Sequence, residues 1–432
     1  MDHLGLDLGT TTISAAVLDA DGRLLCTRTV PGGAAVAGQP WERKQDARGI
    51  EHAALSLLDG LLQEFPDIGC VGLTGQMHGI VYVDAAGQLL SPLYTWQDET
   101  GAQPGPDGKS TAARLTARTG YPLASGYGLV TLACHQAAGT IPNGAAAVCT
   151  IADYLAMRLS GRSAPCLTPS MAASLGLFDG TGFDREAVRR AGLPERLLPE
   201  VSEEAELGGG RLRVFAALGD NQASFLGAGQ GRLDAPLINI GTGSQFSFFT
   251  KEHRTVPGLE TRPFPGGWLL TGAPLCGGRS FALLERFFRQ TAELVTGTPC
   301  PSAYPAMLRA LEAPMPDDVP QFRTTFAGTR QDPAERAVLS GLDEENFAPV
   351  PLLHALLRGM ADELSACYRA ALKAGCAPAG RLLGSGNGLR RNPALQRAVE
   401  RSFGLPLTLA AVPEEAACGA ALFARMQHEA AL

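Results

Sequence analysis

The chain enters its first predicted strand with Leu4-Gly5-Leu6-Asp7-Leu8, turns at Gly9-Thr10-Thr11-Thr12 and resumes with Ile13-Ser14-Ala15-Ala16-Val17. Apolar residues alternate on both sides of the turn, which predicts a strand, a tight turn and a returning strand. A second stretch of this kind, Leu237-Ile238-Asn239-Ile240, turns through Gly241-Thr242-Gly243-Ser244 before Phe246. Two similar hairpins, one in each half of the chain, predict an internal duplication.

Helical and strand-like segments alternate in both halves. Apolar residues recur every three or four positions over 49–65 and 350–374, whereas 71–73 and 80–83 are short apolar runs typical of strands. Asn392 before Pro393 predicts the start of a further helix. The sequence therefore predicts an α/β fold, with an N-terminal domain over residues 1–228 and a C-terminal domain over residues 229–432.

Composition excludes several classes of protein. A chain of 432 residues is too long for one ordinary core, and its net charge of −7 argues against a broad nucleic-acid surface. No apolar run approaches the roughly 18 residues of a membrane span. Asp2 and Asp7 lie where a signal peptide carries positive charge. We expect a cytoplasmic protein, monomeric or homodimeric, with no nucleic-acid or membrane partner.

The cysteines and lysines argue against a disulfide framework, a cysteine metal site and a P-loop. The 10 cysteines are scattered without metal-ligand spacing, which predicts reduced thiols. Lys109 follows a glycine and precedes a serine, but Gln103 lies where a P-loop needs its first glycine. Any bound nucleotide must therefore be held by another design.

The two glycine–threonine turns are candidate phosphate sites. Asp7 lies beside Thr10, Thr11 and Thr12, whose backbone amides and hydroxyls suit phosphate oxygens. A lone turn of this kind equally fits an ordinary hairpin. Its repetition at Gly241-Thr242-Gly243 favours two loops that clamp a triphosphate between domains.

Three further motifs carry polar groups at predicted strand ends. Asp220 follows an apolar run and fits either a helix cap or a base that accepts the proton of an attacking hydroxyl. The turn Gln76-Met77-His78 places an amide, a thioether and an imidazole between two glycines, although a lone histidine is often structural. Trp96 and Asp98 suit a sugar face, with a packed tryptophan and a turn aspartate as the alternative.

Together these motifs resemble the FGGY family of carbohydrate kinases, over nearly the whole chain. The resemblance implies duplicated actin-like ATPase (ribonuclease H-like) domains with an interdomain active-site cleft, sugar on the N-terminal domain and ATP on the C-terminal one. It implies that Asp220 is the catalytic base and that Asp7 helps to hold Mg²⁺. Residues 414–421 are similar to part of the adenosine-binding region. The implied ATP contacts are Thr10, Thr11, Thr12, Gly241, Thr242, Gly243, Gly277, Gly384, Ser385, Gly386 and Asn387.

The resemblance also bears on the acceptor. The sugar-side motifs are most similar to those of ketose kinases, which favours sedoheptulose, with xylulose as the alternative. Thr100 and Pro169 depart from the family pattern, so another sugar or a polyol such as glycerol stays open. A non-catalytic sugar or nucleotide sensor is the alternative of a different class, disfavoured by the two carboxylates. The implied sugar contacts are Gln76, Met77, His78, Trp96, Asp98 and Asn221.

Overall fold

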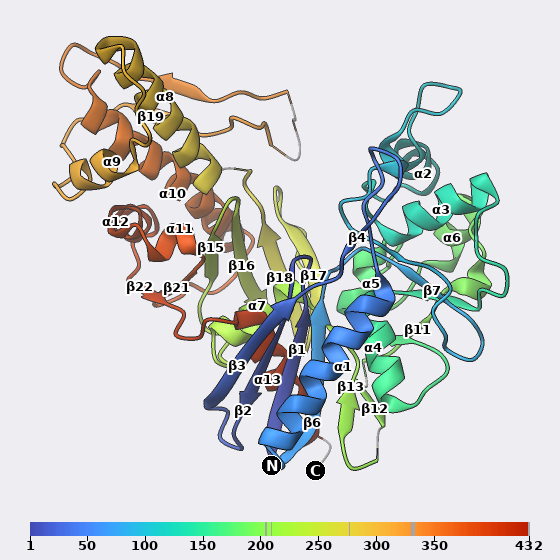
Figure 1. The fold of residues 1–432 in the computed structure, drawn as a ribbon. Helices are drawn as coiled ribbons and strands as arrows, with labels where there is room; N and C mark the ends of the chain where they lie inside the picture. Colours follow the sequence, from blue (N-terminus) through green and yellow to red (C-terminus); the bar gives the residue numbers. More distant parts are fainter. Residues whose placement is uncertain (204, 209, 276, 330–331, 333, 431–432) are drawn as a thin grey trace. The chain divides into compact units, whose positions relative to one another are not determined.

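The computed structural model describes residues 1–430 except 204, 209, 276, 330, 331 and 333, and these form two compact units (Figure 1). The first unit contains Met1–Gly231, Pro263–Pro265 and the chain from Val412 onward. The second contains Arg232–Arg262 and Gly266–Ala411. The predicted division at residue 228 assigned the last helix to the second domain. By its packing, that helix belongs with the first compact unit, so the chain returns to this unit after it has formed the second.

The first unit is built on a sheet of order β12-β13-β6-β1-β2-β3. Strand β1 pairs antiparallel with β2, and β2 with β3, whereas β1 runs parallel to β6. Strand β6 runs parallel to both β13 and β14. The strands are β1 (Asp2–Leu8), β2 (Thr12–Leu18), β3 (Leu24–Pro31), β6 (Ile68–Gly75), β12 (Glu206–Gly208), β13 (Arg213–Phe215) and β14 (Leu218–Gly219).

Helices cover both faces of this sheet, with α1 on one face and α13 across the other (Figure 1). Gly5 and Gly72 are neighbours in register, and a Cβ on either would lie about 2 Å from a carbonyl oxygen of α13. Glycine is therefore required on both strands for this close approach. The helices that pack on the sheet are α1 (Ala47–Glu64), α4 (Ile151–Ser160), α7 (Asp220–Ala228) and α13 (Glu415–Ala430).

Smaller elements complete the first unit. They are β4 (Ala35–Val36), β5 (Lys44–Gln45), β7 (Val81–Val83), β8 (Leu93–Tyr94), η1 (Thr100–Ala102), α2 (Thr111–Thr119), α3 (Gly128–Ala138), β9 (Ala147–Cys149), β10 (Cys166–Leu167), α5 (Pro169–Leu175), α6 (Arg185–Ala191), η2 (Glu195–Leu197) and β11 (Glu200–Val201).

The second unit repeats the connectivity of the first in a sheet of order β17-β18-β16-β15-β21-β22. Strand β15 pairs antiparallel with β16, and β16 with β18, whereas β15 runs parallel to β21, and β21 to β22. The predicted duplication is therefore confirmed. The strands are β15 (Leu237–Ile240), β16 (Ser244–Thr250), β17 (Glu260–Phe264), β18 (Gly267–Gly272), β21 (Leu382–Ser385) and β22 (Leu407–Leu409).

Helix α10 forms much of the core of the second unit, where Leu356 and Met360 pack with Ile238 and Phe246 of the sheet. The predicted cap is confirmed, because Asn392 accepts a hydrogen bond from the backbone of Leu395 at the start of α12. The remaining elements are α8 (Gly278–Thr296), α9 (Tyr304–Ala310), β19 (Gln321–Arg323), β20 (Val338–Ser340), α10 (Pro349–Lys373), α11 (Asn387–Arg390) and α12 (Pro393–Phe403).

The cysteines in the described part of the chain are free thiols, as predicted, and Cys276 lies outside the described residues. Of the helices that the structure describes, none is long and apolar enough to cross a membrane.

Candidate functional site

Three strands of the first unit end side by side. Leu8 of β1 is paired with Gly75 of β6, and Gly75 is paired with Gly219 of β14. Loops that follow the carboxyl ends of parallel strands meet at one edge of a sheet. The turn after β1, the Gln76-Met77-His78 turn and Asp220 are therefore brought together.

Carboxylates gather at this edge. Burial, together with the charges of Asp220 and Glu414, raises the pKa of Asp7 to about 7. Glu414 precedes α13, and its charge acts on Asp7 within the first unit. The resemblance assigns residues 414–421 to part of the adenosine-binding region. In the structure the small side chains that follow Glu414 also allow this segment to pack on Gly5 and Gly72.

Asp220 is the first residue of α7, with Gly219 at the N-cap, so its carboxylate is not the helix cap. The side-chain amide of Asn221 donates to Asp220 Oδ1 at 2.8 Å. From behind, the Ser170 hydroxyl accepts a hydrogen bond from the Gly219 amide at 3.1 Å, and the Thr168 hydroxyl donates to the Ala217 carbonyl at 2.7 Å. The segment around Pro169, which departs from the family pattern, thus supports the strand that leads to Asp220.

The His78 turn rests on the same short helix, α5. His78 has a φ of 72°, and its Nδ1 donates to the Ser174 carbonyl at 2.6 Å while its backbone amide donates to the Ser174 hydroxyl at 3.1 Å. Its ring stacks on Tyr127 with 4.6 Å between the centroids. With Nδ1 as the donor, the neutral ring presents Nε2 as an acceptor. Met77 beside it is buried.

Trp96 and Asp98 have different environments. Trp96 is 48% exposed, which argues against the packed-tryptophan alternative, and its Nε1 donates to the Thr10 hydroxyl at 3.1 Å. Asp98 is buried, and its two carboxylate oxygens accept the backbone amides of Arg43 and Thr100, each at 2.9 Å. These contacts make Asp98 an anchor for the Trp96 loop.

The second glycine–threonine turn lies at the end of β15 in the second unit. The amides of Gly278 and Arg279, in the first turn of α8, donate to the carbonyls of Gly241 and Thr242 at 2.8 and 3.0 Å. Gly277 has a φ of 144°, and a Cβ there would lie 2.5 Å from the carbonyl carbon of Gly243. The predicted ATP contacts at Gly241, Thr242, Gly243 and Gly277 are therefore one packed group.

The Gly384-Ser385-Gly386-Asn387 segment ends the neighbouring parallel strand, β21. Asn239 of β15 is paired with Ser385, and its amide donates to the Ser385 hydroxyl at 3.4 Å. Gly386 has a φ of 87°, and a Cβ there would lie 2.5 Å from the Ile240 carbonyl oxygen. This segment and the Gly241 turn share one edge of the sheet. Asn387 is exposed at the start of α11.

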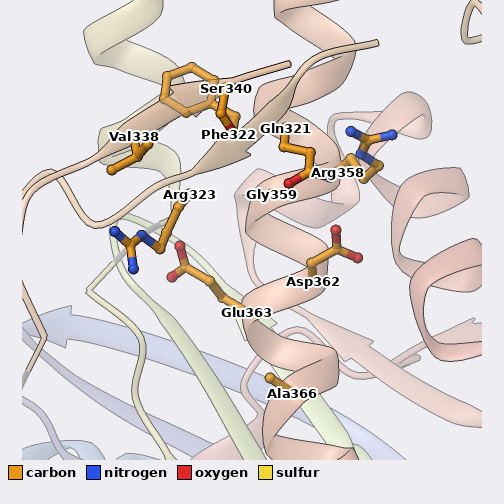
Figure 2. A pocket seen from close by; sticks show the side chains of 10 residues that line it. All are labelled: Gln321, Phe322, Arg323, Val338, Ser340, Arg358, Gly359, Asp362, Glu363 and Ala366. Carbon is orange, nitrogen blue, oxygen red and sulfur yellow. The ribbon is translucent and has the colours of Figure 1, made fainter. Parts of the chain in front are cut away.

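A separate pocket of about 670 Å³ lies among β19, β20 and α10 (Figure 2), and no predicted site residue lines it. Its charged groups have partners within the unit. Glu363 accepts two hydrogen bonds from Thr324, and Arg358 donates to the carbonyls of Val319 and Pro320. We therefore assign it no part in the chemistry.

Comparison with known proteins gives a consistent result. Residues 3–230 match the N-terminal domain, and residues 237–428 the C-terminal domain, of the FGGY family of carbohydrate kinases. The chain is 29% identical to the sedoheptulokinase of Mus musculus, over 97% of this chain and 96% of that protein. It is 25% identical to the xylulose kinase of Streptomyces coelicolor, over 97% and 86%. The crystal structure of xylulose kinase from Rhodospirillum rubrum superposes with a TM-score of 0.81 at 23% identity, covering 99% of this chain and 90% of that one.

Proposed function

Because the chain belongs to the FGGY family of carbohydrate kinases, we propose that it transfers the γ-phosphate of ATP to a primary hydroxyl of sedoheptulose, giving sedoheptulose 7-phosphate. Near full-length similarity to sedoheptulokinase is the observation that favours this sugar. Xylulose is the second candidate, supported by similarity to xylulose kinases over much of the chain.

In this proposal Asp220 is the general base. The acceptor oxygen attacks the γ-phosphorus, its proton passes to the Asp220 carboxylate, and the bond from phosphorus to the β,γ-bridging oxygen breaks to release ADP. The Asn221 amide on Oδ1 holds the carboxylate in one orientation. The hydrogen bonds of the Ser170 and Thr168 hydroxyls to the backbone of Gly219 and Ala217 fix the segment that precedes Asp220.

The sugar would contact the side chains grouped at the edge of the first sheet. The exposed Trp96 ring offers an apolar face for the carbon chain, and the His78 ring, oriented by its bond to Ser174, would hydrogen-bond a sugar hydroxyl. Met77 lies close to the residue before Asp220, because a Cβ on Gly219 would lie 3.0 Å from the Met77 methyl group, and Asn221 follows Asp220 in α7. Gln76 and Asp98 support these contacts from beneath.

The residues present suit Mg²⁺ bound with ATP. Burial and the charges of Asp220 and Glu414 raise the pKa of Asp7, and a divalent cation bound there would offset both effects. Mg²⁺ is commonly held by one or two carboxylates together with phosphate and water. When bound, the ion would neutralise charge on the transferred phosphoryl group.

The decisive experiment is a substrate panel. ADP release with MgATP is measured for sedoheptulose, xylulose and glycerol, and kcat/KM is compared. We expect sedoheptulose to have the highest value. A higher value for xylulose would replace the proposed substrate, and acceptor-independent binding of ATP without any turnover would favour the sensor alternative.

A further inference from the structure

Gln45, in strand β5, is buried directly beneath the first glycine–threonine turn. Its side-chain Nε2 donates to the carbonyl oxygen of Thr10 at 2.7 Å and to that of Gly33 at 3.2 Å. Only 9% of the residue is exposed. Both amide protons are thus given to backbone oxygens, one of them in the turn.

Gln76 extends this contact along the turn. Its Nε2 donates to the Gly9 carbonyl at 3.3 Å and to Gln45 Oε1 at 2.8 Å. Turning either amide over would place its oxygen against a carbonyl oxygen, so the network allows one orientation. The two glutamines therefore form a hydrogen-bonded pair of fixed orientation, which binds the carbonyl oxygens of Gly9 and Thr10.

These hydrogen bonds determine the direction in which the backbone amides of the turn point. A trans peptide holds C=O and N–H on opposite sides, and the described chain has no cis peptide bonds. With the carbonyls of Gly9 and Thr10 directed at the glutamines, the amides of Thr10 and Thr11 point the other way. Successive amides directed to one side form a concave site for an anion.

The second unit fixes the equivalent peptides by another means. There the carbonyls of Gly241 and Thr242 accept hydrogen bonds from the first amides of α8. The same two carbonyls are held in each turn, by side chains in one unit and by a helix start in the other. Because two different sets of hydrogen bonds fix the same peptides in the two units, we infer that the orientation of these peptides matters for the chemistry.

Strand β5 also pairs with β8, which leads into the Trp96 loop. The Thr95 amide and hydroxyl donate to the Arg43 carbonyl at 2.9 and 3.0 Å, and Trp96 Nε1 donates to the Thr10 hydroxyl. Resting on the proposed function, we propose that Gln45 is a positioning residue that aims the Thr10 and Thr11 amides at the phosphates of ATP. It acts through the turn and contacts no substrate.

The test uses the full chain with Gln45→Glu, which keeps the acceptor and loses the amide protons, and Gln45→Met, which is similar in length and uncharged. Gln136→Glu is the matched control, because its exposed amide donates to the Gly192 carbonyl at 2.8 Å. The dissociation constant of MgATP, the KM for ATP, the KM for the sugar and the melting temperature are measured for each.

We expect the Gln45 variants to weaken MgATP binding and raise the KM for ATP by about tenfold, as for the loss of one or two hydrogen bonds, with the sugar KM changed less than about threefold. The control should match the wild type. Should Gln45→Glu fail to fold, Gln45→Met gives the same reading. Equal rises in both KM values, or unchanged MgATP binding in a folded variant, would overturn the inference. Because MgATP binding is measured without a sugar, it tests the inference even if the substrate panel refutes the proposed function.

Discussion

The two units share a sheet topology but differ at the position two residues before the turn glycine. In the first unit this position is Asp7, a carboxylate repelled by Asp220 and Glu414, whereas in the second it is Asn239, whose amide bonds the Ser385 hydroxyl. The turns above these residues are also held differently, by buried glutamines in one and by α8 in the other. The same sheet topology therefore carries mutually repelling carboxylates in the first unit and a hydrogen-bonded neutral side chain in the second. We expect the acid–base chemistry in the first unit.

Asp220→Asn tests this assignment with the largest expected effect. The amide cannot accept the acceptor's proton, so kcat should fall by about 10³, within the range for general-base catalysis, while MgATP binding is kept. Single-turnover rates and MgATP dissociation constants check this. Asp59→Asn, an exposed change on α1, is the control. Near wild-type turnover by Asp220→Asn with every acceptor would place the base elsewhere.

Asp7→Asn gives the first unit the residue type of the second. We expect kcat to fall by about 10², because a candidate metal ligand is lost. In the absence of nucleotide and Mg²⁺ at pH 8, the free energy of unfolding should rise by about 2 kcal/mol, because a buried charge repelled by two others is removed. Steady-state turnover with saturating MgATP measures the first effect, and urea unfolding without nucleotide or Mg²⁺ measures the second. A less stable apo protein would contradict the repulsion.

Gly277→Ala tests the packing of the second turn. The added methyl group meets Gly243 and the backbone leaves a conformation that favours glycine, so the KM for ATP should rise about tenfold while the KM for the sugar is unchanged. Gly297→Ala, at the other end of α8, has a φ of 66° and open space around it, so it reproduces backbone strain without the contact. The same rise in both variants would mean that strain, not the turn contact, causes it.

The sequence predicted the parts of the molecule that follow from local pattern. Alternating apolar residues, the glycine–threonine turns and the Asn392-Pro393 start identified both hairpins and a helix boundary, because turn and cap chemistry is local. The grouping of Asp7, Gln76 and Asp220 followed from each ending or following a strand.

Contacts between distant segments could not be predicted from pattern. Glu414 reaches Asp7 only because α13 returns to the first unit, and the signal for that return was the match of small residues to Gly5 and Gly72. Gln45 carries no signal, since a glutamine before a helix start is ordinary on a surface. The residue type of Asp98 suits either a sugar contact or a turn, and its hydrogen bonds from two backbone amides could not be predicted from the sequence.

A last difference between the units concerns acid stability. Strand β1 carries the buried His3, where the corresponding residue before β15 is Ala235. Burial, followed by the charges of Arg425 and His428, lowers the pKa of His3 to about 4. The unfolded chain takes up this proton near pH 6.5 and the folded chain only near pH 4, so the histidine's contribution to stability is complete above about pH 6.5 and is lost as the pH falls towards 4.

His3→Ala gives the first unit the residue type of the second. It should therefore reduce the decrease in the free energy of unfolding as the pH falls. For the wild type we expect unfolding to cost about 1 kcal/mol less at pH 5.5 than at pH 8 through this group, and the variant should lack that part of the decrease. Urea unfolding at the two pH values gives the comparison, with the exposed His52→Ala on α1 as control. Because the methyl group also leaves a cavity, only the difference between the two pH values carries the result. An equal decrease in wild type and variant would show that the acid sensitivity of the first unit comes from its other groups.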